Sequence, residues 1–397
     1  MLHRRDLLKR SSLIALAPTV PGFLQRLARA AEAKQDDRIL VVVQLDGGND
    51  GVNTVVPYRD EGYARHRDML RLNAANLHKL NDDVALHPAM RAAADLVESD
   101  RLAIVQGVGY PNPNRSHDVS MAIWHTARFD RADHKSYGWI GRALDQAPPS
   151  DSAAAMLVGD GAVPGALVGR RSIAASFSRL DELVIQNQSA RGGLAAQANP
   201  SASDDLTDFV RRATLDAYTT ADRVNAAAGR ERSKANHPSS ELAQHLAIVA
   251  RLIEADMPTQ VYYAVQRGYD THAVQQPTHG RLLRELSEAL KAFLDDLAAA
   301  KLDERVVVLC FSEFGRRVAE NASRGTDHGT AGPVLLAGPR VRAGLHGTTP
   351  SLTDLVDGDL KTSVDFRQVY AALLRDWLRL PPEAPLGGDY EPLELFT

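Results

Sequence analysis

The stretch RILVVVQLDGGND, residues 38–50, decides the fold. Its aliphatic run from Ile39 to Val43 is continuous rather than alternating, which is typical of a strand buried on both faces of a parallel sheet. The run ends at Asp46, two glycines, an asparagine and a second aspartate, and the glycines permit a tight turn close to a ligand. Because ligands bind at the carboxyl ends of parallel strands, we expect Asp46 in a functional site.

Five further apolar runs have the composition of short strands bounded by Gly, Pro or Asp. Amphipathic helical patterns lie between several of them and near the end of the chain. This alternation predicts an α/β fold with a mostly parallel central sheet and helices on both faces. The strand runs are residues 101–109, 154–160, 260–266, 305–313 and 332–338, and the helical patterns are residues 205–227, 241–255, 275–297 and 366–377.

The first thirty residues resemble a twin-arginine export signal, with Arg4 and Arg5 before a short apolar stretch and Ala-Arg-Ala at positions 28–30. The alternative is an amphipathic N-terminal helix. Prolines interrupt the stretch and a membrane-spanning helix needs about 20 apolar residues, so we expect no stable membrane span once the signal is removed. Residues 31–397 are predicted to form one periplasmic or secreted domain with a helical insertion near residues 204–256.

Charge and cysteine content exclude other classes of protein. Without the six Lys/Arg and one Asp of residues 1–30, the formal net charge changes from −4 to −9, so nucleic acid is not an expected partner. The single cysteine, Cys310, cannot form an intramolecular disulfide, and an exported chain must therefore depend on its hydrophobic core. A nucleotide-binding interpretation of DGGNDG fails because the Gly-x-Gly-x-x-Gly spacing is absent.

Carboxylate and imidazole side chains follow several predicted strands, and they are the ligands that divalent cations prefer. We interpret the set as a site for one or two ions of zinc, manganese, calcium or magnesium. Taken singly, Asp46 could cap the next segment, His272 could be a hydrogen-bonded loop histidine, and Asp327 could be a turn former. The candidate metal ligands are Asp46, Asp270, His272, Glu313, Asp327 and His328.

Another candidate lies in YPNPNRSHDVSMAIWHTA, residues 110–127, where a helix is predicted to begin. Ser116 falls at the expected N-cap, where its hydroxyl would accept a hydrogen bond from a backbone amide. The same hydroxyl could equally be a nucleophile, because a helix N-terminus lowers the cost of negative charge. Arg115 could contact an anionic ester oxygen, and His117 could do the same or protonate a leaving group.

Together with residues 40–58, 268–297 and 306–332, this segment and the leader resemble a family of exported bacterial proteins known only as a domain of unknown function. That family is similar in turn to the alkaline phosphatase and sulfatase superfamily. The resemblance implies an alkaline phosphatase-like fold and a metal-dependent hydrolase of phosphate or sulfate esters, acting on a small anionic ester or an envelope polymer. The alternative is a non-catalytic cell-envelope binding protein that retains the fold and a partial metal site.

The resemblance also implies roles for single residues. Thr271 alone separates the Asp and His of the second ligand pair, whereas phosphatases of this superfamily usually separate them by a helical turn. The Cys-x-Pro-x-Arg signature of sulfatases is absent around the implied nucleophile, so no formylglycine is implied. The implied roles are Asp46 as the first-strand metal ligand, Ser116 as nucleophile, Asp270 and His272 as the next ligand pair, Glu313 as the strand-end carboxylate, and His328, beside Asp327, as the late histidine.

Overall fold

The computed structural model describes residues 38–130, 133, 136–146, 153–172, 174–177 and 236–397. The predicted signal and the predicted helix at residues 205–227 lie outside the described residues. Strand β1 (Ile39–Asp46) is buried along its first seven residues. It pairs in parallel with β8 (Val261–Arg267) on one side and β9 (Val306–Phe311) on the other. The continuous aliphatic run therefore forms an interior strand, as predicted.

The central sheet has the strand order β11-β5-β10-β9-β1-β8-β6-β7, and β12 also pairs with β5. All six predicted strands are confirmed. Strand β10 runs antiparallel to its neighbours β5 and β9, whereas the other pairings in this sheet are parallel. The remaining bounds are β5 Leu102–Gly109, β6 Ala155–Val158, β7 Ala174–Phe177, β10 Gly332–Ala337, β11 Gly344–His346 and β12 Val364–Asp365.

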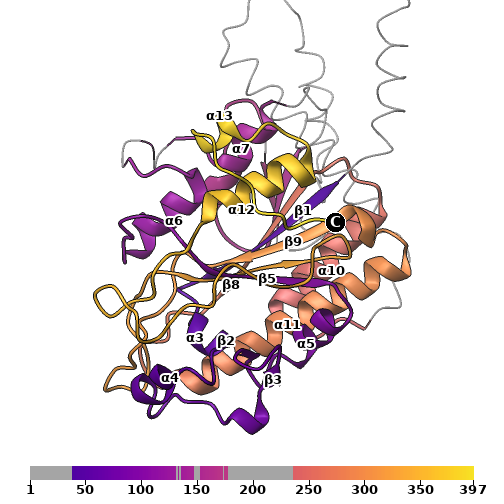
Figure 1. Ribbon diagram of the computed structural model, residues 1–397. Coiled ribbons are helices and arrows are strands. Elements are labelled where there is room, and N and C mark those ends of the chain that lie inside the picture. Colours follow the sequence, from indigo (N-terminus) through magenta and orange to yellow (C-terminus); the bar gives the residue numbers. More distant parts are fainter. Residues whose placement is uncertain (1–37, 131–132, 134–135, 147–152, 173, 178–235) are drawn as a thin grey trace, which may run out of the picture. The chain divides into compact units, whose positions relative to one another are not determined.

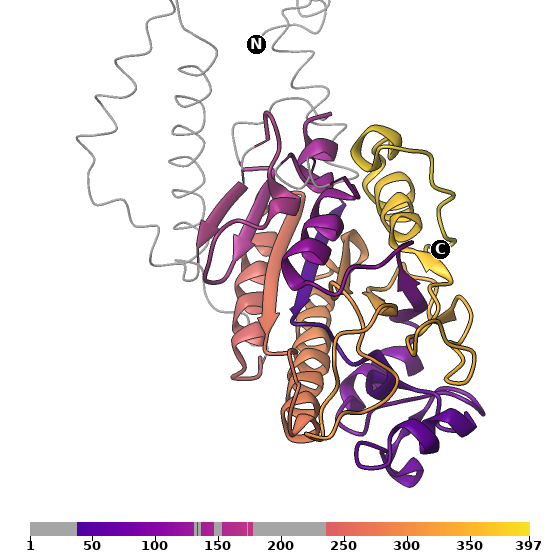
Figure 2. The ribbon, with the colours of Figure 1, turned by 90° about the vertical axis from the view of Figure 1, so that its left-hand side faces the viewer.

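Helices cover both faces of this sheet (Figures 1 and 2), so the predicted α/β class is confirmed. Side chains alternate along β1: Val41 and Val43 join the hydrophobic cluster under one set of helices, and Leu40 and Val42 join the cluster under the other. The first set is α5 (Arg91–Glu98), α10 (Glu241–Glu254) and α11 (Gln275–Ala299); the second is α6 (His117–Thr126), α7 (Trp139–Leu144), α12 (Phe366–Ala372) and α13 (Glu383–Leu386).

The predicted helices at residues 241–255, 275–297 and 366–377 are all present, although the last one widens into a π-helix over Leu373–Leu378. A small antiparallel sheet was not predicted, because its strands are only two residues long. No helix in the described part of the chain combines the length and hydropathy needed to cross a membrane. The small sheet comprises β2 (Val55–Val56), β3 (His78–Lys79) and β4 (Ala85–Leu86). Helix α3 (Gly51–Thr54) precedes β2 in the chain, and helix α4 (Glu61–His66) lies between β2 and β3.

Candidate metal centre

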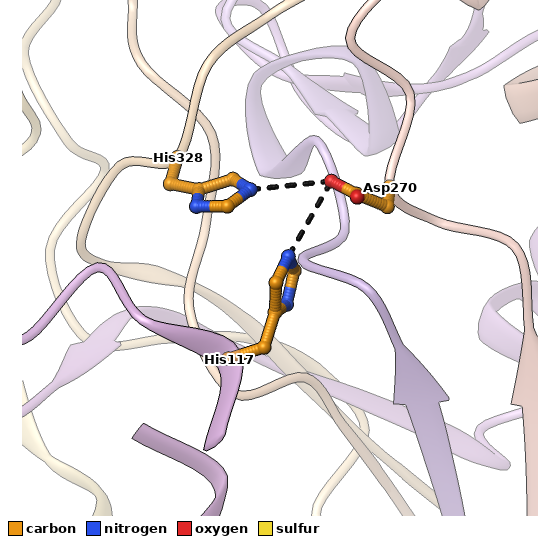
Figure 3. A group of neighbouring side chains, drawn as sticks. All are labelled: His117, Asp270 and His328. Atoms are coloured by element: carbon orange, nitrogen blue, oxygen red, sulfur yellow. Dashed lines mark hydrogen bonds and ion pairs between the residues drawn. The ribbon is translucent and has the colours of Figure 1, made fainter. Parts of the chain in front are cut away.

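Three segments far apart in the sequence bring ligand-type side chains together at the carboxyl edge of the sheet. His117 opens α6, Asp270 follows β8, and His328 precedes β10. Figure 3 shows the three side chains pointing toward one another. One ligand atom from each lies within 4.8 Å of the other two. The reversed direction of β10 is what places His328 here, since an antiparallel strand begins at the edge where its neighbours end.

Asp270 Oδ1 lies at the centre of this cluster. It is 3.0 Å from His272 Nε2, 3.2 Å from His328 Nε2 and 3.4 Å from His117 Nε2. The guanidinium of Arg316 donates to the same oxygen at 2.7 Å. Partial burial raises the pKa of Asp270, but the hydrogen bond from Arg316, together with the positive charge of that guanidinium, outweighs it and lowers the pKa to about 2. The carboxylate is therefore ionised at neutral pH.

Each of the three imidazoles has an outer acceptor at Nδ1. His117 Nδ1 is 2.7 Å from Glu313 Oε1, and His272 Nδ1 is 3.3 Å from Asp327 Oδ1. His328 Nδ1 lies 2.8 Å from the backbone oxygen of Arg115. Because these oxygens accept hydrogen bonds, they favour the tautomer protonated at Nδ1 and leave the Nε2 lone pair directed inward. Outer acceptors of this kind orient histidine ligands in metal sites.

Two inner nitrogens lie where unshared lone pairs would repel. His272 Nε2 and His328 Nε2 are 2.8 Å apart, although the outer acceptors place both protons on the far side of the rings. His117 Nε2 is buried and lacks a hydrogen-bond partner among the described residues. A cation beside Asp270 Oδ1 would satisfy the lone pairs of His117 Nε2 and His328 Nε2. His272 Nε2 also lies 3.4 Å from Arg316 Nη1. Three imidazole nitrogens and one carboxylate oxygen fit zinc or a similar divalent ion.

Glu313 lies behind His117 rather than beside Asp270. Its side chain is buried, and it accepts hydrogen bonds from the Gly47 amide and the Ser312 hydroxyl, each at 3.0 Å. The hydrogen bond to Glu313 raises the pKa of His117. The structure thus gives this carboxylate the geometry of an orienting group, whereas the sequence predicted a ligand.

Asp46 is also separate from the cluster. Its Oδ1 accepts a hydrogen bond from Gln44 Nε2 at 3.0 Å, and Gln44 Oε1 accepts one from the Tyr263 hydroxyl at 2.6 Å. Asp46 points to the same face of the sheet as Gln44 because side chains two apart in a strand share a face. Within the described residues, no ion pair or hydrogen bond joins its carboxylate to Asp270 or the imidazoles.

Ser116 occupies the N-cap position of α6, as predicted, but its hydroxyl makes no capping hydrogen bond. Its backbone amide instead donates to Asn114 Oδ1 at 2.8 Å. The capping explanation for this hydroxyl is therefore wrong, and the exposed side chain stands next to His117 in the chain. The guanidinium of Arg115 pairs with Asp359, while its carbonyl oxygen holds His328.

Sequence reasoning missed Arg316, whose side chain is fully buried. Besides Asp270, its guanidinium binds backbone oxygens of Gly48 at 2.8 Å and Thr326 at 2.9 Å. It thereby ties the loop after β1 to the loop that carries His328. Arg317, the next residue, is partly exposed. The sequence of two adjacent arginines does not indicate which of them is buried.

Comparison with known proteins found one matching family and distant similarity to solved structures, three of which are described here. The model of a family described as protein of unknown function (DUF1501) matches residues 37–376. The chain has no match among curated proteins.

The structural likenesses are to two enzymes and to a superfamily member without a stated activity. A lipoteichoic acid synthase from Listeria monocytogenes is 10% identical, with 83% of this chain and 75% of that chain covered and a TM-score of 0.38. A sulfatase from Pseudoalteromonas sp. is 10% identical, with 94% and 76% covered and a TM-score of 0.41. An alkaline phosphatase superfamily protein from Vibrio parahaemolyticus is 9% identical, with 78% and 62% covered and a TM-score of 0.36. Since these scores are low, the likenesses carry no argument about the chemistry of this chain.

Proposed function

We propose that this chain, which belongs to the DUF1501 family of proteins of unknown function, is an exported metal-dependent hydrolase of phosphate or sulfate esters. The observation that carries the proposal is the convergence of His117 Nε2, Asp270 Oδ1 and His328 Nε2 within 4.8 Å of one another. The outer acceptors at Nδ1 of His117 and His328 support it, because they direct the Nε2 lone pairs of these two residues toward the position of the cation.

The proposed ligands are His117, His272, His328 and Asp270, with Glu313 and Asp327 orienting two of the imidazoles. This set gives His117 a ligand role in place of the proton donation suggested by its sequence position. A divalent cation bound there would supply Lewis acidity, polarising an ester oxygen and making a water or hydroxyl a stronger nucleophile.

Two further side chains have proposed roles at the site, one as the nucleophile and one as the group that positions Asp270. Ser116 is the proposed nucleophile, because its exposed hydroxyl makes no cap bond and stands at the start of a ten-residue helix, where negative charge is stabilised. Arg316 keeps Asp270 ionised and fixed in place. The proposed substrate is a small anionic ester or an ester on an envelope polymer.

Protein purified without its signal is expected to contain about one equivalent of a divalent metal and to hydrolyse a generic phosphate or sulfate ester. Elemental analysis and turnover of 4-nitrophenyl phosphate and 4-nitrophenyl sulfate check this. Removal of the metal with a chelator should abolish turnover, and its re-addition should restore it. A protein that binds metal but is inert on a broad ester panel would be an envelope binding protein instead, and one that binds no metal contradicts the site itself.

Export is tested separately, with Arg4→Lys and Arg5→Lys combined. Lysine keeps the positive charge but loses the planar guanidinium, so recognition of the paired arginines should fail and the protein should remain in the cytoplasm. Cell fractionation and immunoblotting measure its location, with Arg10→Lys as the matched control. Normal export of the double variant would exclude the twin-arginine route.

A further inference from the structure

Two arginines beside the metal cluster share one buried carboxylate. Asp359 is 1% exposed, and its Oδ2 accepts a hydrogen bond from Arg115 Nη2. Its other oxygen, Oδ1, lies 3.2 Å from Arg317 Nε. The turn that carries Asp359 is closed by two backbone hydrogen bonds with Val356. One carboxylate in a fixed turn therefore holds two guanidinium groups.

The guanidinium of Arg317 is held in a defined orientation. Besides Asp359, it donates to the backbone oxygen of Asp357. Gly358, between these two acidic residues, has a φ of +81°, which lets the turn present both acceptors to one side chain. Because the arginine is already fixed, little side-chain entropy remains to be lost when a ligand binds.

The pair carries charge that Asp359 does not balance. Within the described residues, both guanidinium groups form their ion pairs with this one carboxylate. The side chains of Arg115 and Arg317 are 43% and 36% exposed, so both are accessible to a ligand from solvent. A planar guanidinium offers more donors than one carboxylate uses, and spare donors of this kind suit the oxygens of sulfate, phosphate or carboxylate.

Both arginines border the segment that supplies His328. The carbonyl oxygen of Arg115 is 2.8 Å from His328 Nδ1, and the amide nitrogen of Arg317 is 3.0 Å from the carbonyl oxygen of Asp327. The pair therefore flanks the cluster instead of lying on a remote surface.

We infer that Arg115 and Arg317 bind a second anionic group of the substrate, distinct from the ester that is cleaved. The inference rests on the proposed function and narrows its substrate class to esters carried by molecules with at least two oxyanions, such as the repeating unit of an anionic polymer. Asp359 is then a positioning residue, which spaces and orients the two guanidinium groups.

The test measures binding of simple sulfonates to the metal-loaded chain by titration calorimetry. Sulfonates are fully ionised and poor chelators, so they do not strip the metal. Methanesulfonate carries one anionic group, whereas ethane-1,2-, propane-1,3- and butane-1,4-disulfonate carry two at increasing spacing. The best-spaced disulfonate is expected to bind at least about tenfold more tightly than methanesulfonate, the gain typical of an added charge-assisted hydrogen bond.

Arg317→Met is the decisive variant, because Asp359 keeps Arg115 as its partner. In this variant the ratio of the disulfonate affinity to the methanesulfonate affinity is expected to fall to about one, with metal content unchanged. Arg342→Met is the matched control: Arg342 is 52% exposed, pairs with one carboxylate, Glu394, and follows the distal end of β10. Arg317→Lys, which preserves the charge and should fold readily, is expected to retain only part of the preference. An unchanged preference in Arg317→Met, or an equal loss in Arg342→Met, overturns the inference.

A metal-free arm separates this inference from the proposed function. Without metal, weak methanesulfonate binding should report the arginine pair alone and should disappear in Arg317→Met. Such binding in a protein that hydrolyses no ester would support the anion site while the hydrolase proposal fails. Metal-dependent ester turnover with no effect of Arg317→Met on any sulfonate would overturn the anion site alone.

Discussion

Asp270→Asn is expected to lower the affinity for the metal by at least about 100-fold and to abolish ester turnover. The substitution preserves size but removes the one carboxylate oxygen that, among the described residues, lies within 3.4 Å of the inner nitrogens of His117, His272 and His328. Competition with a chromogenic chelator measures the affinity, and initial rates measure turnover.

The matched control is Asp118→Asn, since Asp118 is exposed and adjacent to His117 in α6. It removes the same charge close to the cluster and should leave the affinity nearly unchanged. Glu313→Gln should lower the metal affinity by about 10- to 100-fold, which lies between the effects of the other two substitutions. It leaves the proposed ligands in place and weakens the hydrogen bond that orients His117. An Asp270→Asn protein that retains full metal content and activity would place the metal elsewhere.

Arg67→Met is expected to destabilise the fold by about 3–5 kcal/mol, because it leaves the Asp50 carboxylate buried without its counter-ion. Both side chains are fully buried, and the guanidinium binds the carboxylate through two hydrogen bonds of 2.6 and 2.9 Å. Burial raises the pKa of Asp50, but the charge and hydrogen bonds of Arg67 outweigh this and hold the pKa below its ordinary value. The free energy of unfolding in urea at neutral pH measures the loss.

The control is Arg67→Met combined with Asp50→Asn, which removes the stranded charge and should recover part of the stability. Because the folded-state pKa of Asp50 is lowered, the contribution of the ion pair is present above its unfolded pKa. It is lost as the pH falls through the folded pKa, so wild type and variant should converge in acid. A loss below about 1 kcal/mol at neutral pH would show that water or a rearrangement compensates for the missing guanidinium.

The central strands could be predicted because burial on both faces demands uninterrupted aliphatic residues, as in Ile39 to Val43. The direction of β10 could not, since an aliphatic run such as GPVLLAG has the same composition whichever way it pairs. Strands of two residues, such as Val55–Val56, have no period to detect. Their pairing depends on the packing around them, which no local pattern encodes.

The site was predictable as a set of residue types but not as a set of contacts. Asp270, His272 and His328 do converge, and strand-end placement was enough to select them. Whether Glu313 points at Asp270 or at the intervening imidazole of His117 depends on the position of α6, which sequence spacing does not determine. Asp46 was expected with them because it ends β1, yet the face it takes places it beside Gln44.

The partners of β1 also govern when the protein can fold during synthesis. Leu40 pairs with Val261 and Ile39 with Val306, so β1 waits during synthesis for two strands that come much later in the chain. Until then an aliphatic edge stays open on both sides, which favours slow folding and a need for chaperone protection. Shortening that wait, for example by a circular permutation that opens the chain between α11 and β9 so that β9 is synthesised before β1, should speed folding without changing the finished sheet.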